Sequence, residues 1–239
     1  MKKINLMLAL LAVSTVTFAQ SQQQERITIG EFAQKLQAAG PNAQVLDVRS
    51  RAEYEINHLA GAVNIDLADS AAAAAVIGRL DKSKPVFAYS IQSGRGVILA
   101  RKLREQGFTQ AYGMPGGIVN WVGSGYSLET LKTDRSLVVD INHFHSLIKS
   151  DKVVVVNYSS RHCGSCVRFA PTLAEIEKEF VNDISLIRVE LDDNPELIKD
   201  QQIHLMPTMI IYKNGEVQWR KEGRQTREEI EEAIRKQII

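Results

Sequence analysis

Four consecutive valines, Val153–Val156, require a strand that is buried on both of its faces. β-branched residues favour strands, and a strand that is apolar at every position exposes neither face to water. A sheet that contains such a strand needs helices on each side, which is the α/β arrangement. The valines are followed within a few residues by Cys163 and Cys166, the only cysteines among 239 residues.

The first part of the chain alternates short apolar runs with amphipathic stretches. Residues 43–49 and 84–91 have the composition of buried strands, and residues 93–107 predict a loop followed by a helix. A capping box at Ser50 predicts another helix, and Asn57 is expected to end it in a left-handed turn. Strands that alternate with helices predict a parallel sheet.

The second part has a different order of elements. The valine strand is followed by a helical pattern, a further strand, two strands around Asn214-Gly215 and a closing helix. Asn-Gly between two apolar runs is the strongest short signal of a hairpin. A polar stretch without periodicity separates the two parts. The predicted organisation is a first domain at 26–128, a linker at 129–137 and a second domain at 138–239.

The N-terminus has the pattern of a secretory signal peptide. Lys2 and Lys3 precede an apolar run over residues 4–16, and Ala19 supplies the small residue of a cleavage site. The prediction is a signal peptide at 1–19 and an exported protein, periplasmic if the source is Gram-negative. The run is shorter than the ~20 residues of a membrane span, so no span is expected after cleavage, although an uncleaved anchor is the alternative. The net charge of +1 gives no basis for binding nucleic acid.

The two cysteines have three possible uses: a redox pair, half of a metal site or a structural staple. A bridge across two residues removes little entropy from the unfolded chain, which disfavours the staple. Zinc requires four ligands, and His162 is adjacent to Cys163, which is a poor chelate geometry. At a helix N-terminus the Cys163 thiolate is stabilised, with a pKa of about 3.5–7.5 against an ordinary value near 8.5, and Cys166 can resolve a mixed disulfide. We therefore expect a redox disulfide, no metal and no other cofactor.

The second half resembles thioredoxin. The resemblance rests on segments in that family's order and spacing: VVVVNYSSRHCGSC, Pro171, ELDDNP, MPT and KNGEV. It implies a thioredoxin fold and thiol–disulfide exchange with protein thiols or disulfides, as in cell redox homeostasis. It also implies that Pro207 is a cis-proline facing the cysteines and that the Met206 backbone pairs with an extended substrate chain. Because the sequence contains no third cysteine, we expect a separate redox partner protein to exchange electrons with the pair at Cys163.

Three residues depart from the thioredoxin pattern. Ser165 replaces the usual Pro before the second cysteine, His162 replaces the usual Trp, and Asn157 replaces the usual buried Asp. An Asn side chain has no negative charge, so Asn157 cannot disfavour a nearby thiolate as a buried carboxylate does. A protonated His162 favours the thiolate form of the neighbouring cysteine. We predict a lowered cysteine pKa and a disulfide more oxidising than that of ordinary thioredoxin.

The first half resembles a rhodanese domain, through LDVRSRAEYEINHLAGAVNI, VFAYSIQSGRG and GFTQAYGMPGGIVNW. The position of the family's sulfur-carrying cysteine holds Ser90 or Ile91, depending on the alignment. Arg95 follows Gly94 one place earlier than the family's arginine. Ser90 also lacks a nearby histidine that would make it a hydrolytic nucleophile. The loop is therefore predicted to be inactive in sulfur transfer and to serve binding.

The main hypothesis is an exported two-domain thiol–disulfide oxidoreductase, built from a rhodanese-like parallel α/β domain followed by a thioredoxin fold. One alternative is a non-catalytic peptide-binding or chaperone-like protein that binds its partners in a groove of the thioredoxin-like half. Another alternative is a sulfurtransferase in which Cys163 serves the rhodanese-like half.

Overall fold

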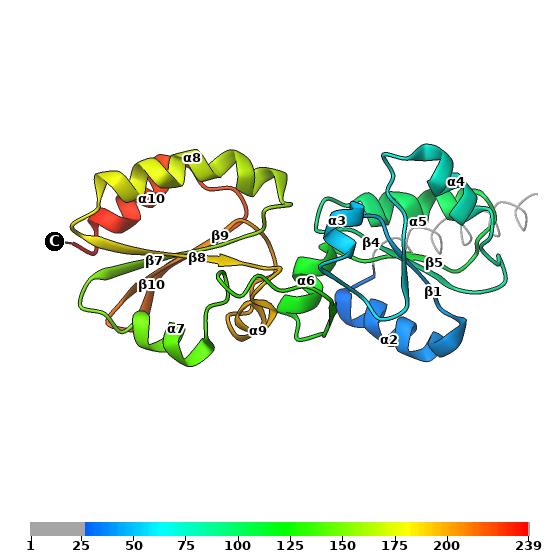
Figure 1. Ribbon diagram of the computed structural model, residues 1–239, viewed down its shortest axis with the longest axis horizontal. Coiled ribbons are helices and arrows are strands. Elements are labelled where there is room, and N and C mark those ends of the chain that lie inside the picture. The colour runs from blue at the N-terminus through cyan, green and yellow to red at the C-terminus, as the bar shows by residue number, and fades with distance from the viewer. Residues whose placement is uncertain (1–26, 239) are drawn as a thin grey trace, which may run out of the picture.

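The computed structural model describes residues 27–238, so the predicted signal peptide at 1–19 lies outside the described residues. Each half contains one four-stranded sheet flanked by helices, and the two halves lie side by side along the long axis of the molecule (Figure 1). Two short helices, α6 (Gly117–Gly123) and α9 (Pro195–Asp200), lie where the halves meet. The predicted α/β class is confirmed.

The sheet of the first half has the strand order β3-β1-β4-β5, and all of its pairings are parallel. Parallel neighbours need crossover connections, which the helices of this half supply. The strands are β1 (Gln44–Asp47), β3 (Ala62–Asn64), β4 (Val86–Tyr89) and β5 (Ala111–Gly113). The longer helices are α2 (Ile29–Ala39), α4 (Ser70–Ile77) and α5 (Arg95–Glu105).

Helices cover both faces of this first sheet. On one face Phe32 of α2 and Trp121 of α6 pack edge to face, with ring centroids 6.1 Å apart. On the other face Ala73 of α4 and Leu103 of α5 pack with Leu46 of β1. Burial on both faces explains why all four residues of β4 are apolar or aromatic, and why β1 has two adjacent apolar residues, Val45 and Leu46, instead of an alternating pattern.

Short elements surround this sheet: η1 (Gly40–Asn42), α3 (Arg51–Tyr54), β2 (Asn57–His58) and β6 (Glu129–Thr130). The capping box at Ser50 is present, but the helix it opens ends at Tyr54. The predicted left-handed turn at Asn57 is wrong, because Asn57 lies in β2 and pairs with Thr130 of β6. Its backbone joins a sheet, and its side chain is bound by Arg49, eight positions away, and by Asp192 of the other half.

The second sheet has the order β10-β9-β7-β8. Strand β7 pairs parallel with β8 and antiparallel with β9, and β10 pairs antiparallel with β9. All seven residues of β7 are buried, as the valine run predicts. Positive φ angles at Asn214 and Gly215 form the predicted hairpin turn. The strands are β7 (Val153–Ser159), β8 (Ile184–Glu190), β9 (Thr208–Lys213) and β10 (Glu216–Glu222).

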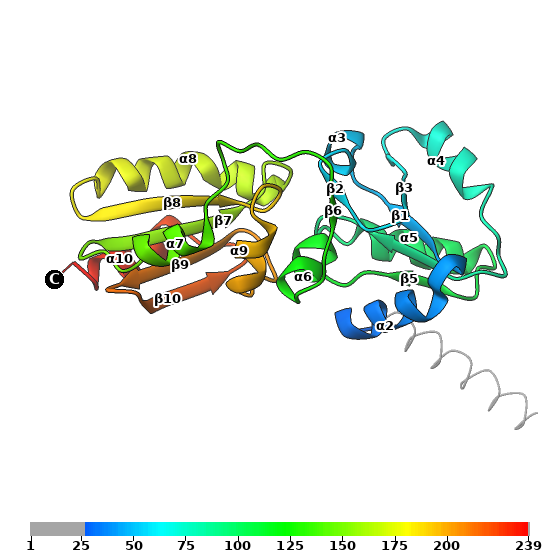
Figure 2. The ribbon, with the colours of Figure 1, turned by 60° about the horizontal axis from the view of Figure 1, so that its bottom comes forward.

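Two pairs of helices cover the second sheet (Figure 2). Val153 and Val155 belong to the core beneath α8 (Gly164–Glu179) and α10 (Arg227–Arg235). Val154 and Val156 belong to the core beneath α7 (Ile141–Leu147) and α9. The alternation of neighbouring valines between two cores is the physical reason that four in a row are needed.

The interface between the halves is closely packed. One continuous cluster of buried apolar side chains includes Trp121 and Val122 of α6 together with Ile198 and Ile203 of the second half. A Cβ atom on Gly123 would lie 2.0 Å from the carbonyl oxygen of Ile203, so only glycine fits there. Within residues 27–238 no helix has the length and apolar character to cross a membrane, and no cluster of side chains is placed to hold a metal ion.

Candidate redox site

The two cysteines lie at the start of α8, directly after the loop that follows the central strand β7. Cys163 is the N-cap residue of α8 and forms a disulfide with Cys166. The backbone N–H of Cys166 donates to Cys163 Sγ at 3.3 Å. This N–H of the first turn of α8 points at the sulfur atom that would carry negative charge after reduction, and the positive end of the helix dipole adds to the stabilisation.

Both cysteines are largely buried. Cys163 is 3% exposed and Cys166 is 6% exposed. Ser165 Oγ lies 3.1 Å from Cys163 Sγ, and the carbonyl oxygen of Met206 lies 4.0 Å from it. The Met206–Pro207 peptide bond is cis, as the resemblance implied. The predicted cysteine and substrate-binding residues thus lie in one place.

Besides Ser165, the other two predicted tuning residues are also near the pair. Asn157 and Cys166 line the same small cavity of about 130 Å³. The Oδ1 atom of Asn157 is buried without a hydrogen-bond partner in the described part of the chain. His162 precedes Cys163, and its Nε2 atom is likewise buried and unpartnered within residues 27–238. Neither side chain places a negative charge beside the sulfur atoms.

A buried serine and aspartate hold the loop that carries Cys163. The backbone N–H of Cys163 donates to the carbonyl oxygen of Ser160 at 3.0 Å, and the N–H of His162 donates to Ser160 Oγ at 3.1 Å. Ser160 Oγ in turn donates to Asp192 Oδ2 at 3.3 Å. Asp192 is only 1% exposed, so its carboxylate is part of the interior that positions the cysteine.

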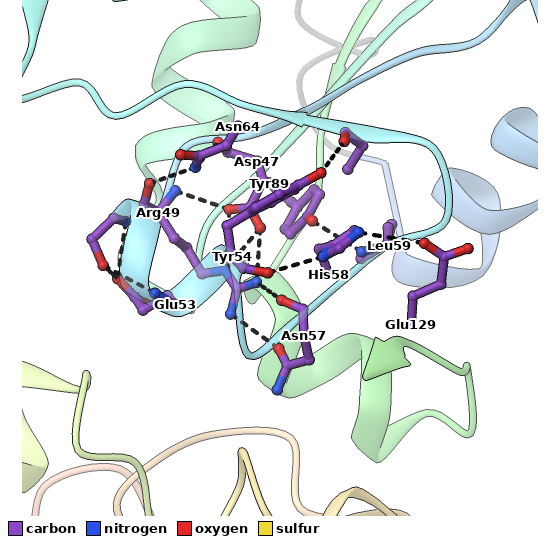
Figure 3. A network of polar contacts seen from close by, with 12 residues as sticks. Asp47, Arg49, Glu53, Tyr54, Asn57, His58, Leu59, Asn64, Tyr89 and Glu129 are labelled. Atoms are coloured by element: carbon purple, nitrogen blue, oxygen red, sulfur yellow. Dashed lines mark hydrogen bonds and ion pairs between the residues drawn. The ribbon is translucent and has the colours of Figure 1, made fainter. Parts of the chain in front are cut away.

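The same carboxylate is connected to the first half. Asn57 Nδ2 donates to Asp192 Oδ1 at 3.3 Å, and Asn57 Oδ1 accepts from Arg49 Nη1 at 3.3 Å. Arg49 also pairs with Asp47 at 2.7 Å, with both side chains fully buried (Figure 3). Burial opposes the charge of Arg49, but the hydrogen bonds and charge of Asp47 raise its pKa above the ordinary value. A series of polar contacts therefore runs from the first sheet to the cysteine loop.

The predicted rhodanese-like loop begins directly after β4. Ser90 and Ile91 are buried, and their carbonyl oxygens accept from the N–H groups of Ile118 and Val119 at 2.9 and 3.2 Å. His58 does not act on Ser90, because its two ring nitrogens lie near backbone and carboxylate oxygens elsewhere. Burial and these two backbone hydrogen bonds to α6 therefore fix Ser90 and Ile91 in place after β4.

The rest of this loop faces the second half. Gly94 has a φ of 77° and caps α5, and Arg95 Nε donates to the hydroxyl of Ser93 at 3.0 Å. Gln92 reaches the redox site: its Nε2 atom donates to the carbonyl oxygen of Met206 at 2.5 Å, and the N–H of Met206 donates to Gln92 Oε1 at 2.9 Å. Gln92 Nε2 is also 3.8 Å from Cys163 Sγ.

A cavity of about 380 Å³ opens between this loop and the disulfide. It is lined by residues of both halves, including Gln92, Arg95, Cys163, Arg168 and Leu205. Arg95 therefore lies at the redox site, although it was predicted only from the rhodanese-like pattern. Sequence reasoning missed Gln92, because no motif or spacing relates a loop residue of one half to the backbone of the other.

The comparisons with known proteins match the two halves of the chain to two different families. Residues 28–124 match the rhodanese-like domain family, and residues 135–236 match the thioredoxin family. The thioredoxin of Rickettsia typhi is 30% identical over 101 residues, which are 42% of this chain and 96% of that protein. The thioredoxin of Mycobacterium tuberculosis is 33% identical over 84 residues, which are 35% of this chain and 67% of that protein.

Among solved structures, a thioredoxin of Plasmodium falciparum is similar with 29% sequence identity and a TM-score of 0.38, covering 41% of this chain and 95% of that one. The fold and the Cys163–Cys166 disulfide define a thiol–disulfide oxidoreductase. The chain belongs to the thioredoxin family through its second half, which follows a rhodanese-like domain.

Proposed function

We propose that this oxidoreductase is exported, exchanges disulfides with other proteins at Cys163, and uses its rhodanese-like half for binding. The observation that supports the exchange best is the position of Cys163 at the N-terminus of α8, disulfide-bonded to Cys166 and next to Met206 and Pro207. This arrangement supplies a stabilised thiolate, a resolving thiol and a backbone surface in one place.

The reaction of the reduced protein has two steps. The Cys163 thiolate attacks one sulfur of a substrate disulfide, that S–S bond breaks, and the second substrate sulfur leaves as a thiolate that takes a proton from solvent. The deprotonated Cys166 then attacks Cys163 Sγ and releases the first substrate sulfur. Two electrons pass to the substrate, and the protein is left with the Cys163–Cys166 disulfide. The reverse steps oxidise a dithiol, and the relative potentials of the partners set the direction.

A separate redox protein completes the cycle. The chain has no third cysteine, so no internal relay can reduce or oxidise the pair. Electrons must enter or leave through a mixed disulfide with another protein, formed at Cys163 because it is the residue whose thiolate is stabilised by the helix N-terminus.

Trapping tests this proposal. A Cys166→Ala variant cannot resolve mixed disulfides, so we expect it to accumulate covalent adducts that dithiothreitol releases. The double variant Cys163→Ala, Cys166→Ala is the matched control and should form none. If the single variant binds proteins without any reducible adduct, the peptide-binding alternative is correct and the exchange reaction is not.

The rhodanese-like half is proposed to be inactive in sulfur transfer, because Ser90 and Ile91 stand where that family carries its cysteine. With thiosulfate and cyanide, the double cysteine variant should form no thiocyanate. Turnover by that variant would contradict this assignment.

One observation favours sulfur transfer through Cys163 as a second candidate function, namely the 3.8 Å approach of Gln92 in the rhodanese-like loop to Cys163 Sγ. The Cys163 thiolate would take the outer sulfur of thiosulfate and release sulfite, and cyanide would then remove that sulfur as thiocyanate and restore the thiolate. Thiocyanate formation by the wild type that is lost in Cys163→Ala identifies this reaction. Its absence in the wild type excludes it.

Export is proposed from the N-terminal pattern. Protein recovered from the space outside the cytoplasm should begin at Gln20, as measured by N-terminal sequencing. Recovery from the cytoplasm with residues 1–19 still attached would contradict export and leave the proposed chemistry unaffected.

A further inference from the structure

The backbone of Met206 is unusual in having its polar groups satisfied by a side chain of the other half. Met206 precedes β9 and is 1% exposed. Buried backbone N–H and C=O groups need partners, and here both groups of one residue bind the side-chain amide of Gln92. Gln92 and Met206 are 114 positions apart in the sequence.

These two hydrogen bonds have the pattern of a strand pairing. In an antiparallel pair, two opposed residues exchange both of their N–H···O bonds. A glutamine amide has an N–H donor and a carbonyl acceptor in the same group, so Gln92 offers Met206 what the backbone of an incoming extended chain would offer.

The location makes this pairing relevant to catalysis. The carbonyl oxygen of Met206 lies 4.0 Å from Cys163 Sγ, and Gln92 Nε2 lies 3.8 Å from the same atom. A polypeptide that brings one of its sulfur atoms to Cys163 must pass beside Met206. In this structure that position is occupied by Gln92.

We propose that Gln92 is a specificity-determining residue for disulfide exchange, because it occupies the position that the main chain of a polypeptide substrate needs. A polypeptide disulfide must displace Gln92 before it pairs with Met206. A small disulfide has no such need, because the cavity of about 380 Å³ beside Cys163 is within the size range of small-molecule sites. This inference rests on the proposed function.

The displacement is physically accessible. Gln92 is half-buried and lies in a loop whose next residue, Ser93, is exposed. Its side chain can rotate away without moving β4 or α5, and the two hydrogen bonds it releases are replaced by those of the substrate backbone. Gln92 thus competes with polypeptide while leaving Cys163 available to smaller partners.

The test compares Gln92→Ala with the wild type on two substrates. The reduced proteins are mixed anaerobically with a synthetic peptide that carries a disulfide in an extended segment, or with bis(2-hydroxyethyl) disulfide, and protein oxidation is followed by acid quenching and mass spectrometry. We expect the rate constant with the peptide to rise about fivefold, equivalent to one net hydrogen bond, and that with the small disulfide to change less than twofold. Gln34→Ala, an exposed change on α2, is the matched control and should match the wild type.

A second variant separates hydrogen bonding from simple covering. Gln92→Met keeps the length of the side chain and adds no charge, but it has no N–H donor for the Met206 carbonyl and no strong acceptor for the Met206 N–H, so it should accelerate the peptide reaction as alanine does. Equal acceleration of both substrates, or no acceleration of the peptide reaction in either variant, would overturn the role of Gln92. Disulfide exchange that persists in the Cys163→Ser variant at the wild-type rate would instead contradict the proposed function. The two failures are therefore distinguishable.

Discussion

Asn57 of the first half donates a hydrogen bond to Asp192 of the second half, from Nδ2 to Oδ1 at 3.3 Å. The other oxygen of the same carboxylate accepts from Ser160, whose backbone holds the N–H of Cys163. One buried carboxylate therefore both joins the two halves and anchors the catalytic loop. Substitutions in the rhodanese-like half that disturb Asn57 are therefore expected to alter the position of the loop that carries Cys163.

Replacing Asp192 should destabilise the protein. Asp192→Ala leaves the buried donors of Asn57 and Ser160 without their acceptor, and we expect the free energy of unfolding to fall by about 1–3 kcal/mol. Urea denaturation measures this change. Asp183→Ala, at an exposed position, is the control and should stay within about 0.5 kcal/mol of the wild type. Equal effects of the two changes would show that Asp192 has no anchoring role.

Adding one methyl group at the interface should separate the halves locally. A Cβ on Gly123 meets the carbonyl oxygen of Ile203 at 2.0 Å, so Gly123→Ala forces backbone to move at a cost of about 1–3 kcal/mol. We expect faster alkylation of Cys163 by iodoacetamide in the reduced protein, because a shift of the Ile203 backbone is expected to move the nearby residue Met206, whose carbonyl oxygen lies 4.0 Å from Cys163 Sγ. Gly30→Ala, where no atom lies within 4 Å of the new Cβ, is the control. Unchanged alkylation in Gly123→Ala would contradict the contact.

Introducing a carboxylate at position 157, which lines a cavity together with Cys166, should make the disulfide more reducing. In Asn157→Asp a negative charge faces the cavity that also contains Cys166, which disfavours the thiolate form and so destabilises the reduced protein. We expect the pH midpoint of thiol alkylation to rise by about 1 and the reduction potential to become more negative in a glutathione redox titration. Asn182→Asp, an exposed change, should leave both values as they are.

The wild-type Cys163 thiol is expected to titrate below the ordinary cysteine value of about 8.5. The helix N-terminus and the N–H of Cys166 stabilise its thiolate, while Asn157 adds no opposing charge. The rate of iodoacetamide alkylation as a function of pH measures this midpoint. A value at or above 8.5 would contradict the tuning predicted from Asn157, His162 and Ser165.

Much of the fold and of the redox pair was predictable because the signals are local. The valine run, the Asn214-Gly215 turn and the C-x-x-C at a helix start are each decided by residues within a few positions of one another. The partners of Asn57 are not local, and its predicted left-handed turn is wrong because its environment comes from Arg49 and Asp192.

The contact between Gln92 and Met206 was not predictable for a related reason. Each residue lies in a loop, and loop composition says nothing about which distant backbone will approach. The orientation of the two halves decides that contact, and the sequence of either half alone does not encode that orientation in a readable pattern.

The apolar cluster that passes from the first half into the second predicts that the two halves unfold together as one cooperative unit. Severing the chain between the halves would expose Trp121 and Val122 on one fragment and Ile198 and Ile203 on the other, and both fragments would tend to self-associate. Heating should accordingly unfold both halves in one calorimetric transition, even though each half has its own four-stranded sheet and its own helices.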